Sequence, residues 1–141
     1  MTELSSLMYQ LKRSDQKITQ LFEERLGISL TRYEILSQLL KQAPCTQIAL
    51  QDSLQIDQAA ITRHLRILEQ SAYIERKRNP KNQRQVIVYV TDKAIQEIQV
   101  NPSQEHKKVK QQMQQILSDS EVQNLSILLD KLVTGLENIN F

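Results

Sequence analysis

Basic side chains gather in the middle of the chain, where they could hold a polyanion. Residues 57–84 carry seven basic and three acidic side chains, a net charge of +4, whereas residues 1–56 are neutral and residues 85–141 carry −2. Such a density of lysine and arginine suits the phosphates of nucleic acid. A solvated charged surface without a ligand would have the same composition, so both interpretations stay open on charge alone. The basic members are Arg63, Arg66, Arg76, Lys77, Arg78, Lys81 and Arg84.

The first half of this basic segment predicts a helix over residues 58–70. Ile61, Leu65 and Leu68 recur at helical spacing, and Asp57 is a good N-cap before them. The residues on the opposite side then face solvent, and their types suit a DNA groove. Amides and guanidinium groups reach base edges and phosphates, while alanines allow close approach or contact a thymine methyl. The predicted DNA-binding residues of this helix are Gln58, Ala59, Ala60, Thr62, Arg63 and Arg66.

The second half predicts a β-hairpin with a basic tip. Residues 73–76 and 85–90 are β-branched or aromatic runs typical of strands. The polar segment 77–84 between them contains Asn79-Pro80, a turn signal. A basic tip of this kind suits the DNA backbone or the minor groove. We expect DNA contacts there from Lys77, Arg78, Lys81 and Arg84.

A short helix must precede these elements to position them. Thr46 predicts its start, with Ile48 and Ala49 facing the interior and Leu50 as a further candidate, and a tight turn at residues 55–56 follows. The order short helix, turn, helix, basic hairpin is that of a winged helix-turn-helix, in which the turn sets the second helix for entry into the major groove. Gln47, at the first helical position, would touch a phosphate or simply face solvent; both readings stay open.

Two further helices lie before this lobe. Residues 3–26 carry apolar side chains at helical spacing, and Gly27 supplies the left-handed residue that commonly follows a helix. Thr31 then predicts the N-cap of a second helix, with Glu34 completing a capping box. Residues 31–91 would thus form the DNA-binding lobe.

The C-terminal part predicts helices as well. Thr91 with Asp92 caps a helix over residues 92–117 that breaks at Asn101-Pro102. Ser118 with Glu121 forms the capping box of a last, leucine-striped helix. Residues 1–26 and 92–141 together carry more apolar surface than one small domain needs. We therefore expect them to be dimerisation helices that bury one another across a twofold axis. A monomer that folds them onto its own core is the alternative.

Length and composition bound the fold. A chain of 141 residues with 40% hydrophobic residues fits a single domain over residues 1–141. Two glycines and three prolines are too few for a many-stranded barrel, so the expected class is mainly α with a small β-hairpin wing, α+β overall. No stretch of 18 apolar residues and no secretory signal stand out. We expect a cytoplasmic protein without a membrane span, associated with the nucleoid when it is bound to DNA.

These segments together resemble the MarR family of bacterial transcriptional regulators. The resemblance rests on residues 48–49, 56–69, 73–76 and 82–93, and the flanking helices have the family's order and lengths. It implies an obligate homodimer that binds a palindromic double-stranded DNA operator. It also implies a repressor that a small-molecule effector or oxidation releases.

The family's wing motif, an acidic residue, any residue and an arginine, corresponds here to Asn82-Gln83-Arg84. Arg84 matches the wing arginine that reaches the minor groove in family members. Asn82 replaces the acidic residue that braces the wing by an ion pair. An asparagine can still hydrogen-bond the backbone or Arg84, so we expect a softer wing in the same place.

The resemblance also implies an effector pocket between the DNA-binding lobe and the dimerisation helices. Its candidate residues follow from position alone and are Tyr9, Arg13, Lys17 and Tyr33.

His64 is interpreted as a partly covered helix residue, with DNA contact or a pH-sensitive switch as the alternatives. Cys45, the single cysteine, is interpreted as a small buried filler, with redox sensing as the alternative.

Catalytic and metal chemistry find little support. His64 and His106 lie far apart, and neither has a second ligand at metal-binding spacing. Two glycines cannot form a phosphate-binding loop, and no nucleophile motif stands out. We expect no enzyme, no metal and no cofactor. The rival to a DNA-binding regulator is a winged helix that binds a protein partner without reading DNA, which would not need the basic segment.

Overall fold

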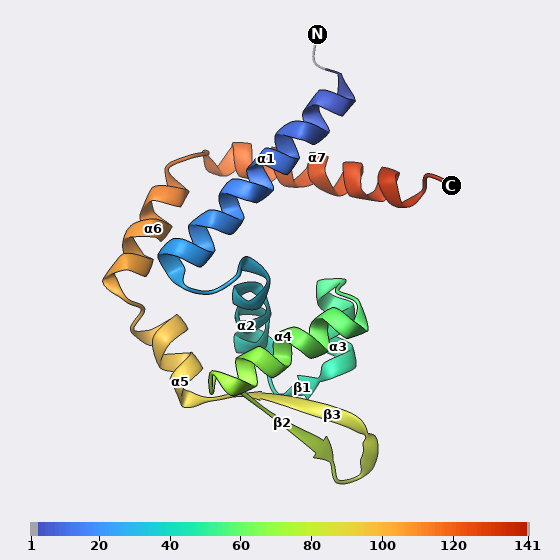
Figure 1. The fold of residues 1–141 in the computed structure, drawn as a ribbon, viewed down its shortest axis with the longest axis vertical. Coiled ribbons are helices and arrows are strands. Elements are labelled where there is room, and N and C mark those ends of the chain that lie inside the picture. Colours follow the sequence, from blue (N-terminus) through green and yellow to red (C-terminus); the bar gives the residue numbers. More distant parts are fainter. Residues whose placement is uncertain (1–2, 141) are drawn as a thin grey trace. The chain divides into compact units, whose positions relative to one another are not determined.

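The computed structural model describes residues 3–140 and confirms a mainly helical chain with one small sheet (Figure 1). The chain forms two compact units, with the division between Ser103 and Gln104. The elements are α1 (Leu4–Leu21), a π-helical segment (Phe22–Leu26), α2 (Leu30–Gln42), β1 (Cys45–Thr46), α3 (Gln47–Leu54), α4 (Gln58–Gln70), β2 (Ile74–Asn79), β3 (Asn82–Val90), α5 (Asp92–Ala94), a second π-helical segment (Ile95–Val100), α6 (Gln104–Gln114) and α7 (Asp119–Glu137).

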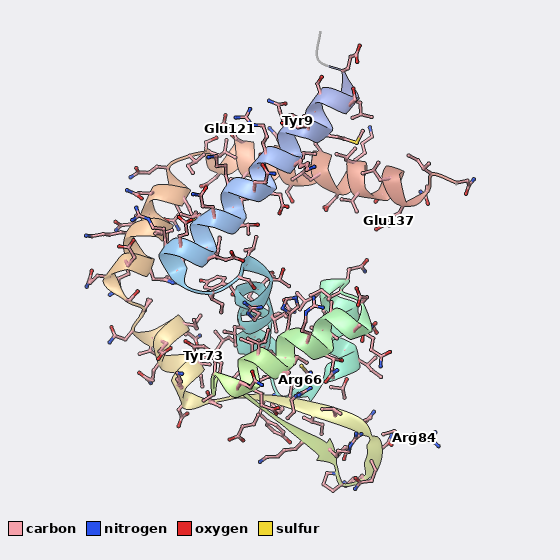
Figure 2. The ribbon with its side chains drawn as sticks, viewed as in Figure 1. Tyr9, Arg66, Tyr73, Arg84, Glu121 and Glu137 are labelled. Carbon is pink, nitrogen blue, oxygen red and sulfur yellow. The ribbon has the colours of Figure 1, made fainter. Side chains whose placement is uncertain are left out.

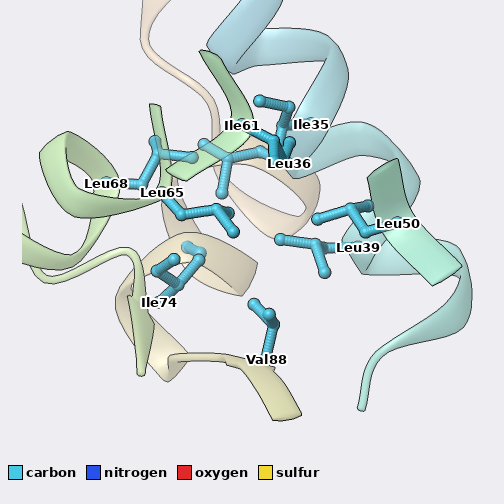
Figure 3. Close-up of a cluster of buried hydrophobic side chains, with 10 residues drawn as sticks. Ile35, Leu36, Leu39, Leu50, Ile61, Leu65, Leu68, Ile74 and Val88 are labelled. Atoms are coloured by element: carbon cyan, nitrogen blue, oxygen red, sulfur yellow. The ribbon is translucent and has the colours of Figure 1, made fainter. Parts of the chain in front are cut away.

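The core of the first unit lies between three helices and the hairpin (Figure 3). Helices α2, α3 and α4 and strands β2 and β3 all contribute side chains that are at most 1% exposed. Burying one such side chain stabilises the fold by about 1.5–3 kcal/mol. The cluster therefore fixes which face of α4 points away from it. Its members are Ile35, Leu36, Leu39, Leu50, Ile61, Leu65, Leu68, Ile74, Val88 and Ala94.

The sheet is antiparallel with the order β1-β3-β2. Ile74 pairs with Val90 at the base of the hairpin and Arg78 with Val86 farther out, with a register shift between Arg78 and Asn79. The predicted hairpin is confirmed, but its strands extend through most of residues 77–84, which the sequence assigned to the tip. Cross-strand hydrogen bonding continues there because each polar residue in an exposed ribbon still has its backbone groups to pair.

Most predicted helix ends are confirmed. Thr46, Asp57, Thr91 and Ser118 cap their helices through side-chain oxygens, and Gly27 has φ 70°, the left-handed conformation. The predicted Thr31 cap of α2 is wrong. Ser29 Oγ accepts the hydrogen bond from the Arg32 backbone nitrogen at 3.2 Å, so the helix begins two residues earlier.

The predicted inner face of α3 is wrong for Ile48 and Ala49 and confirmed for Leu50, the further candidate. Ile48 is 64% exposed and Ala49 is exposed, whereas Leu50 is fully buried. Three consecutive apolar residues in an eight-residue helix are compatible with more than one inward face. Packing against α2 and α4 selects Leu50, which leaves Ile48 on the surface beside the N-terminus of α3.

The second unit consists of α6 and α7. Many apolar side chains of α7 remain exposed within the chain; among them Leu125 is 43% and Leu128 61% exposed. The predicted break at Asn101-Pro102 is confirmed, because the π-helical segment Ile95–Val100 ends there and α6 begins at Gln104. Within residues 3–140, no helix is both long and apolar enough to cross a membrane.

Candidate nucleic-acid interface

The outer face of α4 presents the predicted DNA-binding residues. Gln58, Ala59, Arg63 and Arg66 are exposed, while Ala60 and Thr62 are half-buried. The Asp57 side chain accepts a hydrogen bond from the Ala60 backbone nitrogen at 2.8 Å and fixes the first turn of the helix. The opposite side of α4 lies in the core, so these residues cannot turn inward without breaking it.

One hydrogen bond joins α3 to α4, and a second one lies within α4. Gln47 Nε2 donates to Thr62 Oγ1 at 3.2 Å, and Thr62 Oγ1 donates to the Gln58 carbonyl oxygen at 2.8 Å. The other amide atom, Gln47 Oε1, is buried and has no protein partner. Gln47 and Thr62 thus engage each other rather than standing free on the surface.

The hairpin is fixed by its own side chains. Asn82 Oδ1 accepts from the Arg84 backbone nitrogen at 3.2 Å, and Asn79 Oδ1 accepts from the Lys81 backbone nitrogen at 3.0 Å. The Arg78 guanidinium donates to the Gln83 carbonyl oxygen at 2.9 Å. Asn82 therefore holds the backbone of Arg84, one of the two roles expected for it, and Arg84 itself projects from the hairpin (Figure 2).

A groove of about 570 Å³ runs between α3, the start of α4 and the hairpin. It brings Gln47, Gln58 and two wing arginines, all far apart in sequence, to one surface. Donors on both sides of such a groove suit a polyanionic backbone lying along it. The lining residues are Thr46, Gln47, Ile48, Gln51, Gln58, Arg78, Arg84, Gln85 and Val86.

The basic residues of the central segment differ in how they are held. Arg76 pairs with Glu69 at 3.1 Å, and this hydrogen bond lowers the pKa of the Glu69 carboxyl. Lys77 lies 3.8 Å from Glu75 and 5.4 Å from the centre of the Tyr89 ring, on the strand face opposite to that of Arg76. In the described part of the chain no ion pair engages Arg63, Arg66, Lys81 or Arg84, which leaves these four cations available to a ligand.

His64 contacts α2 instead of pointing freely to solvent, as its interpretation as a partly covered residue predicts. Its Nδ1 lies 3.3 Å from an Arg32 guanidinium nitrogen. Because arginine can only donate, Nδ1 accepts and the ring is neutral with its proton on Nε2. Burial, followed by the charges of Arg32 and Arg63, lowers the pKa of His64 below its ordinary 6.5. Arg32 carried no signal in the sequence that linked it to His64.

This contact predicts a pH dependence of stability. Because the folded state disfavours protonated His64, neutral His64 makes its full contribution to the free energy of unfolding above about pH 6.5. This contribution is lost as the pH falls toward the lowered pKa. We expect His64→Asn, which keeps an acceptor but does not titrate, to flatten the fall in unfolding free energy between pH 7 and pH 5. Urea unfolding of both proteins across this range is the measurement. His106, whose pKa is also lowered, is common to both proteins. If the unfolding free energies of the wild type and the variant differed by the same amount at every pH, the prediction would be contradicted.

Tyr73 connects the hairpin to the segment that follows it, a link the sequence analysis missed. Its hydroxyl donates to Glu97 Oε2 at 2.6 Å, and this bond raises the pKa of Tyr73 to about 12. Lys93 lies 4.6 Å from the ring centre and donates to the Ser71 carbonyl oxygen. The partners are 24 residues apart, and no local pattern indicated the pairing.

The candidate effector residues are less closely assembled. Tyr9, Arg13 and Lys17 are exposed on α1, whereas Tyr33 is half-buried and its ring packs edge-to-face with that of Phe22, with 5.7 Å between the ring centres. An effector site at these residues stays a prediction.

Cys45 is half-buried. Its Sγ accepts from Gln42 Nε2 at 3.8 Å, and burial raises the pKa of its thiol. A raised thiol pKa fits the filler interpretation, since a reactive cysteine needs a lowered one. Within residues 3–140, no cluster of three or more histidine, cysteine or acidic side chains is placed to hold a metal ion.

Comparison with known proteins identifies the family. Residues 28–86 match the model of the MarR family. The chain is 33% identical over 140 residues to the uncharacterised HTH-type transcriptional regulator YdgJ of Bacillus subtilis, covering 99% of this chain and 82% of that protein. Reduced AbfR bound to DNA has the same fold, with a TM-score of 0.75 and 23% identity, and the match covers 95% of this chain and 94% of AbfR. PcaV of Streptomyces coelicolor, solved with its natural ligand, matches with a TM-score of 0.74 and 16% identity, and the match covers 94% of this chain and 93% of PcaV. This chain belongs to the MarR family.

Proposed function

We propose that this chain is a transcriptional regulator that binds double-stranded operator DNA. The observation that carries the proposal is the exposed outer face of α4, with two unpaired arginines, beside a groove that Arg84 and Arg78 border on the wing side. The relatives named above support it, because YdgJ and PcaV are transcriptional regulators by name and AbfR is bound to DNA in its structure. Binding to an operator implies a protein of the cytoplasm and nucleoid.

The two halves of the interface are assigned different roles. On α4, Gln58, Arg63 and Arg66 would face base edges in the major groove, with Ala59 and Ala60 allowing close approach. On the hairpin, Arg84 would reach the adjacent minor groove, and Lys81 and Arg78 the phosphates. Lys77, also a predicted contact, lies on the other face of the hairpin and does not line the groove.

The chain would bind as a homodimer. Residues 31–91 form the DNA-binding lobe in this proposal, and residues 1–26 and 92–141 the dimerisation helices. Supporting it, α1 and α7 each leave a row of large apolar side chains exposed, an amount of apolar surface that a monomer rarely presents to water. A twofold dimer would read a palindromic operator with half-sites about one helical turn apart. The exposed large apolar side chains are Leu4, Leu7, Met8, Tyr9 and Ile18 on α1 and Val122, Leu125, Ile127, Leu128, Val133 and Leu136 on α7.

The assignment predicts that two basic residues behave differently. Arg63→Ala should lower the preference for operator over random DNA by about 1–3 kcal/mol, because a base-edge contact is lost. Lys81→Ala should instead weaken binding to all duplexes similarly and reduce the slope of log affinity against log salt by about one. Fluorescence anisotropy with operator and random duplexes at several salt concentrations measures both quantities. Equal weakening on every sequence by both variants would show that α4 does not read bases.

A repressor role and release by a small molecule are further parts of the proposal. PcaV, which has this fold, was solved with its natural ligand, and the positions of Tyr9, Arg13, Lys17 and Tyr33 are the candidates for an effector site here. A transcription assay in vitro with operator placed over a promoter tests the sign: repression supports the proposal, and activation contradicts it.

The experiment that tests DNA reading is selection of bound sequences from a random duplex pool by the purified protein. Enrichment of a palindrome with half-sites about one turn apart supports the dimeric reader and supplies the operator. Sequence-blind, salt-sensitive binding or no binding would contradict it and favour a winged helix that binds a protein.

A further inference from the structure

Thr62 lies on the outer side of α4 among residues that suit DNA contact, yet its hydroxyl is already engaged. The single hydroxyl proton is donated to the Gln58 carbonyl oxygen at 2.8 Å, and the oxygen accepts from Gln47 Nε2 at 3.2 Å. Phosphate oxygens only accept hydrogen bonds, so Thr62 could bind one only by releasing Gln58. The side chain is half-buried, in contrast to the exposed Gln58, Arg63 and Arg66.

Gln47 is held in the same way from the other helix. It is the first residue of α3 and lines the groove, and its side chain donates to Thr62 in the second turn of α4. Its Oε1 is buried without a protein partner, which places the amide inward rather than along the open surface. Among the side chains that the structure describes, this is the one hydrogen bond that joins α3 to α4.

The bond acts where the relative orientation of the two helices matters most. The connecting turn is short, with Gln55 in the left-handed conformation at φ 56°, and Leu50 of α3 and Ile61 of α4 belong to the same core cluster. The hydrogen bond joins the first residue of α3 to the second turn of α4. Gln58, whose carbonyl accepts from Thr62, begins α4 and lines the groove beside Arg84. A reading surface must be held to within about 0.5 Å by supporting groups to keep its geometry.

We propose that Gln47 and Thr62 are positioning residues that set the angle of α4, and that base reading falls to Gln58, Arg63 and Arg66. This inference rests on the proposed DNA-binding function and deepens it by dividing the polar side chains of the interface into those that touch DNA and those that hold them in place. It requires the two residues to act as one unit, because each contributes through the same hydrogen bond.

A double-mutant cycle tests this unit. We expect Thr62→Val and Gln47→Leu each to weaken operator binding about five-fold, the effect of one net hydrogen bond, and the double variant to be no weaker than either one. Binding to random duplex, which depends on phosphate contacts, should change less than two-fold in all three. Titrations use the folded, active fraction of each protein, so that a lower yield of folded protein does not affect the dissociation constant.

Two further variants separate positioning from direct contact. Valine keeps the shape and methyl group of Thr62 and removes the hydroxyl, whereas Thr62→Ser keeps the hydroxyl; we expect serine to remain within about two-fold of the wild-type affinity. Gln51→Leu removes another glutamine of α3 that lines the groove but has no bond to Thr62. Its effect, whatever its size, should add to that of Thr62→Val.

The outcomes decide between the two proposals. Three results would overturn the positioning role: additive losses of operator affinity for the Gln47 and Thr62 variants, equal losses of affinity for random duplex, or weaker operator binding by the serine variant than by the valine variant. If the wild-type chain still selects an operator in these cases, the proposed function stands. A wild-type chain that prefers no duplex overturns the proposed function, and this inference with it.

Discussion

Replacing Leu65 by alanine is expected to lower the free energy of unfolding by about 2–5 kcal/mol. Leu65 is fully buried on the inner face of α4, among the residues of Figure 3. The change removes three carbons and leaves a cavity, because the surrounding helices and hairpin can collapse only in part. Marginal stability makes such a loss a large share of the total for a domain of this size. Urea or thermal unfolding of the purified protein measures it.

Gln70→Ala is the matched control for Leu65→Ala. Gln70 is exposed at the last position of the same helix and contributes nothing to the core, so its replacement should change the unfolding free energy by less than about 0.5 kcal/mol. The prediction for Leu65 would be wrong if its loss fell to the level of this control. Such a small loss for Leu65→Ala would also show that α4 does not depend on the core for its position.

The second large effect is expected from charges on the apolar face of α7. Leu125→Asp combined with Leu128→Asp should convert the proposed dimer into a monomer, because two carboxylates per chain would have to be buried in an apolar interface. A monomer presents one half-site reader instead of two, so operator affinity should fall by about 10²- to 10⁴-fold. Sedimentation velocity reports the oligomeric state, and anisotropy with operator DNA reports the affinity.

The control for these charges is Gln123→Asp, on the opposite side of α7 from Leu125 at helical spacing. This variant adds one charge to the same helix and should leave the oligomeric state unchanged. If the doubly substituted chain still sedimented as a dimer, α7 would not be in the interface, and the exposed apolar row would need another explanation. Because the substitutions lie in the second unit, the core of the first unit is unaffected, and circular dichroism with unfolding curves checks this.

Local signals in the sequence determined the positions of most elements and the identity of the family. The caps at Thr46, Asp57, Thr91 and Ser118 are short-range hydrogen bonds within one helical turn, so residue types three positions apart suffice to predict them. The apolar period of α4 is also local and fixed which face is outward. For that reason the exposed Gln58, Ala59, Arg63 and Arg66 could be predicted without a structure.

Tertiary structure alone decided which apolar and polar residues find distant partners. Ile48 and Leu50 are both apolar and only two residues apart, and the choice of Leu50 for the core depends on where α2 and α4 stand. The hairpin strands extend through polar residues because cross-strand backbone pairing does not depend on side-chain polarity.

The same limit applies to the interface. The sequence indicated Thr62, and as one of two readings Gln47, as DNA contacts because both are polar and belong to the predicted helix-turn-helix. Their mutual hydrogen bond spans 15 residues, and the contact between Arg32 and His64 spans 32. Whether a polar group is free for a ligand or engaged by a neighbour depends on groups that the folded chain brings within about 3 Å. Residue type and spacing along the chain carry no information about such neighbours.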